Sequence, residues 1–378
     1  MGHFFSLYAN MTVGTIAKII EDWAPKELAW EKDNVGLQVG EYSGSVKKIL
    51  VALEVTDALL DEAEKKKVQL IVSHHPLIFR PLKSVTMNDR VGRLVRRLIQ
   101  KNIALYSAHT NLDFTKNGVS IALAEQLGLE NIEFLVPLSP MHKKVVVFVP
   151  RDCVEKVSEA MSNVGAGIIG NYDLCSFRVE GKGTFRGNDK SNPFIGTSKR
   201  LESVDEVRLE MLVPKWKLHN VLSAMKSVHP YEEVAFDVYP LENISSDCGM
   251  GAIGNLKKEM KLKNFLRHVK TKLGCSNLRY SNGKNETISK VAVCGGSGSE
   301  FLSNAIAKNA DAYITADVSY HPFHDAENNI VLVDAGHYET EKHILPKIVE
   351  RLTTEFRNRN DNAEIILAQT RTSAIHWQ

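Results

Sequence analysis

The sequence predicts an α/β protein made of two related three-layer α/β lobes, with a smaller α+β domain inserted between them. Continuous apolar strands alternate with helices over residues 48–129 and again over 290–370, which is typical of parallel sheets covered by helices on both faces. The middle segment instead has the order β-α-β-β-α-β, which is typical of a ferredoxin-like unit. We place the N-terminal lobe at 11–136, the insert at 137–243 and the C-terminal lobe at 244–378.

In the N-terminal lobe the apolar positions of VGTIAKIIEDWA are spaced as on a helix, which predicts a helix over residues 13–24. Three strand–helix pairs follow, each an apolar run and then an amphipathic segment. The strands are predicted at 48–55, 68–75 and 103–113, and the helices at 57–67, 89–102 and 118–129.

The C-terminal lobe repeats this pattern with strands that run into turns or loops. Its strands are predicted at 290–298, 311–321, 329–341 and 363–370, and its helices at 299–310 and 342–358.

The insert is predicted from four strand-like runs and two amphipathic helices. The strands are expected at 143–150, 171–181, 207–214 and 233–241, and the helices at 153–167 and 217–230. The polar segment 183–200 is expected to be a mobile hairpin loop, with a functional role left open.

The composition is that of an ordinary globular protein, with 378 residues, 43% hydrophobic and 24% charged. It excludes collagen-like, low-complexity and wholly disordered chains. A formal net charge of +2 argues against a protein that coats nucleic acid, although binding through a local basic patch stays open. Five scattered cysteines without a C-x-x-C pair argue against disulfides and thiolate zinc sites, and no apolar run reaches the ~20 residues that cross a membrane. We therefore expect a cytoplasmic protein.

Three clusters that combine polar side chains with histidine follow predicted strands. The clusters are SHHP (residues 73–76), HTNLD (109–113) and GHYETE (336–341). A single strand-end histidine is more often a hydrogen-bonded structural residue than a ligand. Three such clusters at the carboxyl ends of parallel strands, where ligands gather, favour a metal site instead.

The local chain geometry supports this interpretation. Pro76 holds His75 extended at the strand exit, so that His74 and His75 can both flank metal ions. His337 and Glu341 are four residues apart and share a helix face if a helix begins there. Imidazole and carboxylate ligands suit Zn, Mn, Fe or Ni, and this many candidates is enough for two ions that share a bridging carboxylate.

The two lobes are expected to supply these residues in the same way. His75 ends the second strand of the first lobe, as His321 nearly ends the second strand of the other. His109 ends the third strand of the first lobe, as His337 ends the corresponding strand later. Our hypothesis is a duplication whose halves face each other across one metal cleft.

Two further features have two interpretations each. The turn CGGSG (294–298) lies between a strand and a helix, where exposed amides hold phosphates, but a tight packing turn fits equally well. The helix at 89–102 carries five cations, which form either a solvated face or an anion-attracting rim.

Five sequence blocks resemble the signature blocks of one known family. The blocks are DNVGLQVG (33–40), SHHP (73–76), HTNLD (109–113), DVSYH (317–321) and GHYETE (336–341). They are similar to those of the Nif-three-like dinuclear metal-centre proteins, also called GTP cyclohydrolase 1 type 2 homologues, and occur in the same order through both lobes. The middle segment, with HPYEE (229–233), resembles the PII- or CutA-like insert of longer bacterial members.

The resemblance implies a site with two divalent metal ions, zinc first and manganese, iron or nickel as alternatives. The implied ligands are His74, His75, Asp113, His337 and Glu341. Glu341 would bridge the ions, and His109 would be a ligand or the catalytic acid/base. The resemblance also implies a toroidal homohexamer.

A metal-dependent hydrolase of the GTP cyclohydrolase type is the function that the resemblance implies, with CGGSG or the Arg-rich helix holding the triphosphate of a nucleotide substrate. Two alternatives stay open. One is a phosphoesterase acting on nucleotides or nucleic acid, because two metals stabilise an in-line displacement equally well. The other is a non-enzymatic metal-binding regulator or scaffold.

Overall fold

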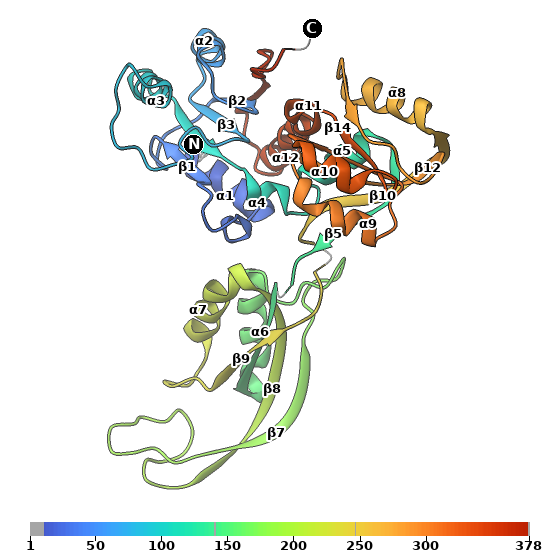
Figure 1. The fold of residues 1–378 in the computed structure, drawn as a ribbon. Helices are drawn as coiled ribbons and strands as arrows, with labels where there is room; N and C mark the ends of the chain where they lie inside the picture. Colours follow the sequence, from blue (N-terminus) through green and yellow to red (C-terminus); the bar gives the residue numbers. More distant parts are fainter. Residues whose placement is uncertain (1–10, 140, 246, 377–378) are drawn as a thin grey trace. The chain divides into compact units, whose positions relative to one another are not determined.

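The computed structural model describes residues 11–139, 141–245 and 247–376, and Figure 1 follows them through two compact units. One unit combines the chain up to Pro137 with the chain from residue 246 onward, and the other is Leu138–Ser245. Within the described ranges, no helix has both the length and the apolar character that a membrane span requires.

The first sheet has the strand order β1-β4-β3-β2-β15. Its strands are β1 Gly36–Val39, β2 Lys48–Ala52, β3 Leu70–Ser73, β4 Ala104–Ser107 and β15 Glu364–Leu367. β15, β2, β3 and β4 are parallel, and only β1 pairs antiparallel, with β4. All residues of β3 and β4 are buried, which explains their continuous apolar runs.

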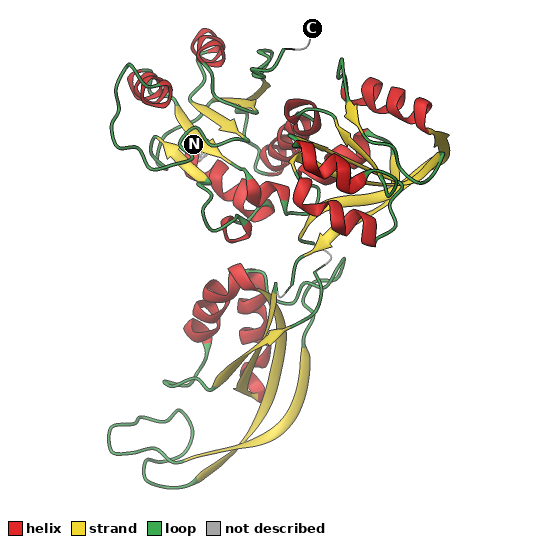
Figure 2. Cartoon of the chain, viewed as in Figure 1, coloured by secondary structure: helices red, strands yellow, loops and turns green. Residues whose placement is uncertain are grey.

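Helices cover both faces of this sheet. On β2, Ile49 and Val51 face one apolar cluster, whereas Leu50 and Ala52 face another. The first cluster contains α1 (Val13–Trp23) and α12 (Ile344–Asn358), and the second contains α2 (Asp57–Lys66) and α3 (Arg90–Gln100). The alternation of side chains along a buried strand therefore produces the three layers that Figure 2 shows as helices on either side of the strands.

The second sheet has the order β11-β14-β13-β12-β10-β5. Its strands are β5 Leu129–Pro137, β10 Gly249–Lys261, β11 Arg279–Tyr280, β12 Thr287–Ser297, β13 Ala312–Ala316 and β14 Val331–Asp334. The helices are α5 Val119–Gln126 and α8 Leu262–Leu273 in one apolar cluster, and α9 Leu302–Ala307 and α10 Tyr320–Ala326 along the other. Two short helices, α4 Thr110–Asp113 and α11 His337–Glu341, follow β4 and β14.

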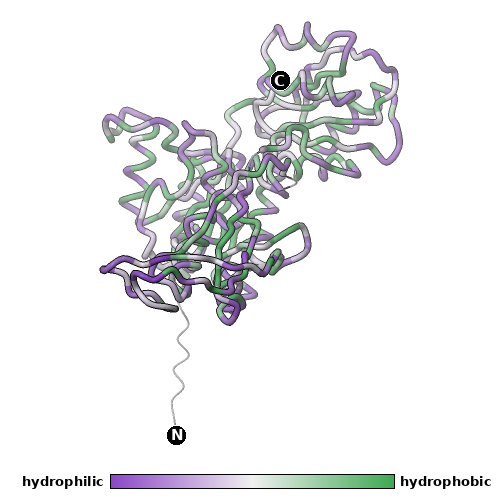
Figure 3. The backbone as a smooth tube through the Cα atoms, turned by 90° about the horizontal axis from the view of Figure 1, so that it is seen from below, coloured by the Kyte–Doolittle hydropathy of each residue, from purple (hydrophilic) through white to green (hydrophobic). Residues whose placement is uncertain are grey.

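The two sheets share a layout of three parallel strands with an antiparallel strand beside the last. These are β2-β3-β4 with β1, and β12-β13-β14 with β11. In Figure 3 the hydrophobic stretches run through the interior of this unit, and hydrophilic stretches mark its outer loops.

The two halves of the first unit also exchange elements. β15, which the sequence analysis assigns to the C-terminal lobe, pairs with β2 of the first sheet, as in Ile365↔Ile49. Conversely, β5 pairs with β10 of the second sheet, as in Phe134↔Ala252. The Glu62 carboxylate of α2 accepts hydrogen bonds from the main-chain N–H groups just after β15, at 3.0 and 2.9 Å. Each sheet is thus completed by a strand from the other half of the chain.

The insert is a four-stranded antiparallel sheet with two helices on one face. Its strands are β6 His142–Pro150, β7 Phe177–Phe185, β8 Glu202–Pro214 and β9 Phe236–Leu241, and its helices are α6 Val154–Asn163 and α7 Leu218–Val228. The order β7-β8-β6-β9 is that of a ferredoxin-like fold. The α/β fold class with an inserted α+β domain, predicted from the sequence, is confirmed.

Four 3₁₀ helices occur among the described residues: η1 Lys26–Leu28, η2 Arg151–Cys153, η3 Lys215–Lys217 and η4 Ser299–Phe301.

We expect the packing of α12 on the first sheet to stabilise the whole unit. Leu352 is fully buried in the cluster that α12 shares with α1 and β2. Leu352→Ala should lower the free energy of unfolding by about 2–5 kcal/mol, because it removes buried methyl groups and leaves a cavity. Chemical denaturation measures this, with the exposed Thr354 of the same helix, changed to Ala, as control. Equal stability of the two variants would contradict this packing.

Candidate metal centre

Three strand ends bring histidine and carboxylate side chains to one place. His74 and His75 follow β3, and His109 follows β4, which is the next strand of the first sheet. His337 and Glu341 come from α11, directly after β14 of the second sheet. The ends of parallel strands in two different sheets therefore meet at this site.

The imidazoles form two groups that can each hold a metal ion. His74, His75 and His109 make one group, and His75, His337 and Glu341 make the other. In each group the ligand atoms lie within 4.8 Å of one another. His75 belongs to both groups, and its Nε2 lies 3.3 Å from the Nε2 of His337.

The Glu341 carboxylate is buried among these histidines. Its oxygens lie 2.9 Å from His75 Nε2 and 3.1 Å from His337 Nε2. The more distant His74 Nε2 is 3.7 Å from Glu341 and 3.6 Å from the Asp113 carboxylate. The structure thus brings together all six residues that the sequence analysis selected, although Asp113 contacts the cluster only through His74 at this distance.

Three of the imidazoles are oriented by carboxylates behind them. The distances from Nδ1 to the carboxylate oxygen are 3.2 Å for His75–Glu54, 2.9 Å for His109–Asp33 and 2.6 Å for His337–Asp317. An ionised carboxylate only accepts hydrogen bonds, so each Nδ1 donates and each Nε2 is left to face the centre of the cluster. Metal-binding histidines are commonly oriented in this way.

The fourth imidazole, His74, is fully buried. Its Nδ1 donates to the carbonyl oxygen of Ala108 at 2.8 Å, because a carbonyl can only accept. Its Nε2 therefore also faces the cluster.

Buried atoms without hydrogen-bond partners test whether a metal fits here. Among the described residues, His74 Nε2 and Asp113 Oδ1 are buried and take part in no hydrogen bond. Glu341 Oε2 is also buried and lacks hydrogen-bond geometry, although it lies 2.9 Å from His75 Nε2. Leaving such atoms unsatisfied costs about 1–3 kcal/mol each, and more for charged groups. All three are good ligand atoms for a divalent cation, so the donor set fits a metal site.

The metal-free cluster holds protons that a metal would displace. Burial alone would lower the pKa of His75, but the Glu341 carboxylate outweighs it and raises that pKa to about 10. Burial also opposes protonation of His337, yet Asp317 and Glu341 raise its pKa to about 11. Burial would raise the pKa of Glu341, but the surrounding imidazoles hold it well below its usual range. Burial and the nearby Glu341 charge raise the pKa of Asp113 to about 7.

The CGGSG segment packs against the cluster and does not present free amides to a phosphate at its two central glycines. Gly295 N donates to Ser120 Oγ at 3.3 Å, and Gly296 N donates to Thr340 Oγ1 at 3.0 Å. A Cβ on Gly296 would lie 2.2 Å from Glu341 Oε1, and its φ is +63°. Of the two interpretations, close packing agrees with the structure, but the segment is the irregular end of β12, which runs to Ser297, rather than a turn.

The cationic helix α3 is engaged in ion pairs with α2. Arg93 pairs with Asp57 at 2.9 Å, and Arg97 and Lys101 both pair with Glu64. These exposed pairs agree with the interpretation as a solvated face rather than an anion-attracting rim.

His321 lies outside the two groups. It is exposed on α10, where its ring contacts Tyr320 with 5.6 Å between centroids. The strand that corresponds to β3 in the second sheet, β13, instead contributes Asp317, which immediately follows it and bonds to His337. The expected place of His321 at the cleft is therefore corrected, because the chain turns into α10 before it.

Three contributing residues were missed by sequence reasoning: Asp33, Glu54 and Asp317. Glu54 follows β2 and Asp317 follows β13, so a search for carboxylates at every strand end would have found both. Asp33 begins the DNVGLQVG block, and its carboxylate also accepts the Thr110 hydroxyl at 2.5 Å. Later in that block, Asn34 and Gln38 donate to the Ile78 carbonyl.

Gly296→Ala should disturb the cluster more than the fold. The added Cβ collides with Glu341, whereas Gly274, with the same φ of +63°, has only the flexible end of Lys342 at 3.3 Å. Both changes to Ala carry the left-handed backbone strain of about 1 kcal/mol. We expect only Gly296→Ala to reduce the metal content of the purified chain, measured by elemental analysis. Equal metal content in both variants would show that the close approach of Gly296 to Glu341 does not affect metal binding.

Metal uptake should release protons. At pH 7.5 the metal-free His75 and His337 are both protonated, since their pKa values are about 10 and 11. A metal binds neutral imidazole, so loading should release about two protons from this pair, and affinity should fall as pH falls. Calorimetry in buffers of different ionisation enthalpy measures the release, and His75→Asn should reduce it.

The same pKa values set how the stability of the metal-free chain depends on pH. Because both are raised above the usual histidine pKa of about 6.5, the stabilisation from these histidines is complete below about pH 6.5. It is lost as the pH rises through about 10. For the proton-release prediction, metal uptake at pH 7.5 without release of protons would be the contradicting result.

Comparisons with known proteins identify the family. The Duf34/NIF3 (NGG1p interacting factor 3) profile matches residues 11–374. A Bacillus subtilis protein named GTP cyclohydrolase 1 type 2 homolog is 41% identical over 361 residues, which are 95% of this chain and 96% of the relative. A crystal structure of a Bacillus cereus protein related to NIF3 has a TM-score of 0.87 and 39% identity, and covers 97% of this chain and 99% of that one. A crystal structure of a Staphylococcus aureus protein has a TM-score of 0.78 and 28% identity, and covers 98% of this chain and 99% of that one. The chain therefore belongs to the Duf34/NIF3 family, as its signature blocks predicted.

Proposed function

We propose that this chain is a metal-dependent hydrolase with two divalent ions in its candidate metal centre. The observation that carries the proposal is the pair of buried ligand atoms without hydrogen-bond partners, His74 Nε2 and Asp113 Oδ1, beside the buried Glu341 carboxylate. The proposed ligands are His74, His75, Asp113, His337 and Glu341, with Glu341 shared because it lies between His75 and His337. Zinc is the first candidate, and manganese, iron and nickel suit the same donors.

Bound divalent ions would supply Lewis-acid activation of a water molecule for hydrolysis at neutral pH. His109 belongs to the group of His74 and His75, but the buried Asp113 Oδ1, which lies 3.6 Å from His74 Nε2, is the proposed ligand in its place. His109 is the proposed acid/base that moves the proton. Hydrogen bonds to His109 and Thr110 outweigh burial and hold the pKa of Asp33 at about 2, so Asp33 stays ionised. It thereby keeps the proton of His109 on Nδ1, and Nε2 faces the site to accept or return a proton.

The first candidate substrate is GTP, because the similar Bacillus subtilis protein is named a GTP cyclohydrolase 1 type 2 homolog. A second candidate is a phosphoester of a nucleotide or nucleic acid. It is favoured by the amides of Gly295 and Gly296 and by Arg93 and Arg97 of α3, which already have protein partners and are therefore not free to hold a triphosphate. In a phosphoester the metals themselves would hold the reacting phosphate.

The proposed setting is a reducing cytoplasm, because the sequence has five scattered cysteines and no C-x-x-C pair. A homohexamer is the proposed assembly, following the family resemblance, and light scattering of the purified chain tests it.

The experiment loads the purified chain with each metal and supplies GTP, bis-(p-nitrophenyl) phosphate and single-stranded oligonucleotides. His109→Asn should keep the metals but lower kcat by about 10²–10⁴-fold, because it removes proton transfer. Glu341→Gln should lose metal and turnover together. His321→Asn is the control and should match the wild type, since His321 is exposed outside the cluster.

Several outcomes would contradict the proposal. Metal-loaded protein that turns over none of the three substrate classes leaves the non-enzymatic regulator as the better account. Full activity of His109→Asn would show that this histidine is not the acid/base. Metal analysis that gives one ion per chain would reduce the site to a mononuclear centre.

A further inference from the structure

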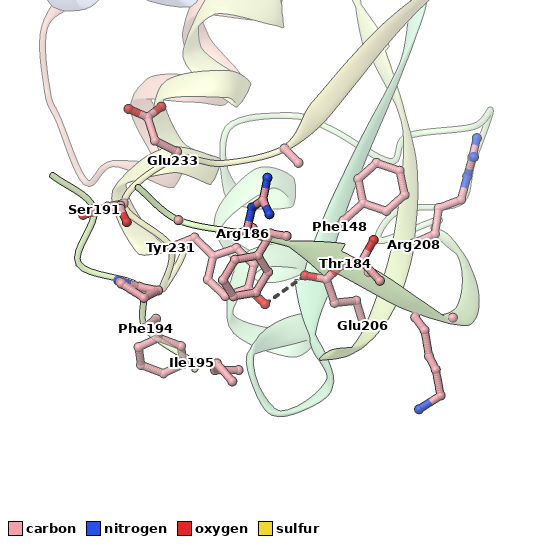
Figure 4. A pocket seen from close by; sticks show the side chains of 18 of the residues that line it. Phe148, Thr184, Arg186, Ser191, Phe194, Ile195, Glu206, Arg208, Tyr231 and Glu233 are labelled. Atoms are coloured by element: carbon pink, nitrogen blue, oxygen red, sulfur yellow. Dashed lines mark hydrogen bonds between the residues drawn. The ribbon is translucent and has the colours of Figure 1, made fainter. Parts of the chain in front are cut away.

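The insert contains a cavity of about 670 Å³ that the metal centre does not use. Its wall is formed by the ends of β7 and β8, by residues 186–195 of the loop between them, and by the chain just before β9 (Figure 4). Everything that lines it belongs to the unit Leu138–Ser245. The volume lies in the range of pockets that hold small organic ligands, about 300–1,000 Å³.

Aromatic rings dominate the lining. Phe148 comes from β6, Phe185 from the end of β7, Phe194 from the loop and Tyr231 from the segment before β9. The Phe194 and Tyr231 rings lie 6.4 Å apart between centroids, with 52° between their planes. Such rings offer flat apolar surfaces against which a planar ligand packs.

The polar part of the wall is fixed in place by hydrogen bonds. The Tyr231 hydroxyl donates to Glu206 Oε1 at 2.8 Å, which Figure 4 shows as a dashed line. Glu206 lies over Gly183, where a Cβ would be only 2.0 Å from Glu206 Oε2. Burial and the Glu206 carboxylate raise the pKa of Tyr231, so its hydroxyl stays a donor.

The HPYEE segment, which has no role in the metal centre, builds this wall. The His229 ring bonds on one side to the Phe148 carbonyl at 3.1 Å. On the other side its Nδ1 accepts the Tyr231 main-chain N–H at 3.1 Å. Glu232 accepts the main-chain N–H of Asn192 at 2.9 Å, which fastens the loop to this segment.

The loop is also tied to itself and to β8. Lys199 N donates to the Gly187 carbonyl at 2.8 Å, and Thr197 N donates to Glu202 Oε1 at 3.1 Å. The cavity is therefore organised before a ligand arrives, which lowers the entropy cost of binding.

Among the cations of the lining, Arg186 is the one for which the described residues show no ion pair. Lys182 pairs with Asp205 at 2.8 Å, and Arg208 donates to Glu210 at 2.9 Å. For the Arg186 guanidinium, no partner is found among the residues that the structure describes. An arginine on a cavity wall without a protein partner is suited to bind an anionic group of a ligand.

The acidic residues of the lining are engaged or turned away. Glu206 and Glu232 hold Tyr231 and the loop, and Glu180 pairs with Arg151. Figure 4 shows the Glu233 carboxylate pointing away from the rings. The unpaired charge that the cavity offers a ligand is therefore positive.

We propose that this cavity binds a small molecule with a flat aromatic ring system and one anionic group. The ring system of the ligand packs against Phe194, Tyr231 and Phe148, and the anion binds the Arg186 guanidinium. Thr184, which also lines the cavity, offers a hydroxyl that adds polar selectivity.

The test titrates the full chain with naphthalene-2-carboxylate by calorimetry. Two comparison probes separate the contributions: cyclohexanecarboxylate has the anion without the aromatic rings, and 2-naphthylmethylammonium has the rings with the opposite charge. We expect saturable binding of naphthalene-2-carboxylate with one site per chain, and binding of the other two at least about tenfold weaker.

Matched variants locate the binding. Arg186→Gln should weaken binding of naphthalene-2-carboxylate by about tenfold or more, because it removes a charge-assisted hydrogen bond. Arg200→Gln, an exposed arginine outside the lining, should leave binding unchanged. Phe194→Ala should weaken binding, whereas Phe177→Ala, at an exposed phenylalanine outside the lining, should not. Circular dichroism confirms that each variant is folded.

Several results would overturn the proposal. Wild-type protein that shows no saturable binding would mean that the cavity takes no such ligand. Equal binding by Arg186→Gln would place the carboxylate elsewhere, with the metal centre as the obvious alternative. Equal binding of cation and anion, or equal loss in Phe177→Ala and Phe194→Ala, would indicate non-specific adsorption to apolar surface.

Discussion

The structure depends on a buried carboxylate from one sheet that meets imidazoles from another. Glu341 lies on α11, which follows β14 of the second sheet. Its closest partner, His75, follows β3 of the first sheet. Burying these charges is favourable only if they remain close and well oriented. The exchanged strands β5 and β15 hold the two sheets in one unit, so the fold supplies the fixed geometry that the charge cluster needs.

Much of the fold was predictable because its central strands are short, continuous apolar runs. The starts of most of these runs and helices were found close to their actual positions. Several strands were predicted too long, such as 103–113 for β4 (Ala104–Ser107), and β10 and α8 were not predicted. The partners of the outer strands were not predictable. β5 reads LENIEFLVP, with exposed glutamates among its apolar residues, and it pairs with a strand more than a hundred residues later. Local periodicity holds no information about such a partner, nor about the strand that β15 joins.

The histidine cluster was predictable for a related reason: carboxyl ends of parallel strands converge, so residues that follow them meet. The orienting carboxylates were harder to predict. Asp33 lies in a loop before β1, and only the folded chain brings it to His109, 76 residues later. His321 was placed wrongly for a different reason. It follows β13 closely in the sequence, but the chain turns into α10 and leaves His321 exposed.

The position of β15 also has a consequence for biosynthesis. This strand lies at residues 364–367 of a chain of 378, and it pairs with a strand made some three hundred residues earlier. A chain still emerging from the ribosome therefore holds its first sheet with one edge uncovered until residues 364–367 have been made. Exposed strand edges of this kind attract other chains. Rapid synthesis of the residues between β2 and β15, or shielding by a chaperone, would protect the nascent protein during that interval.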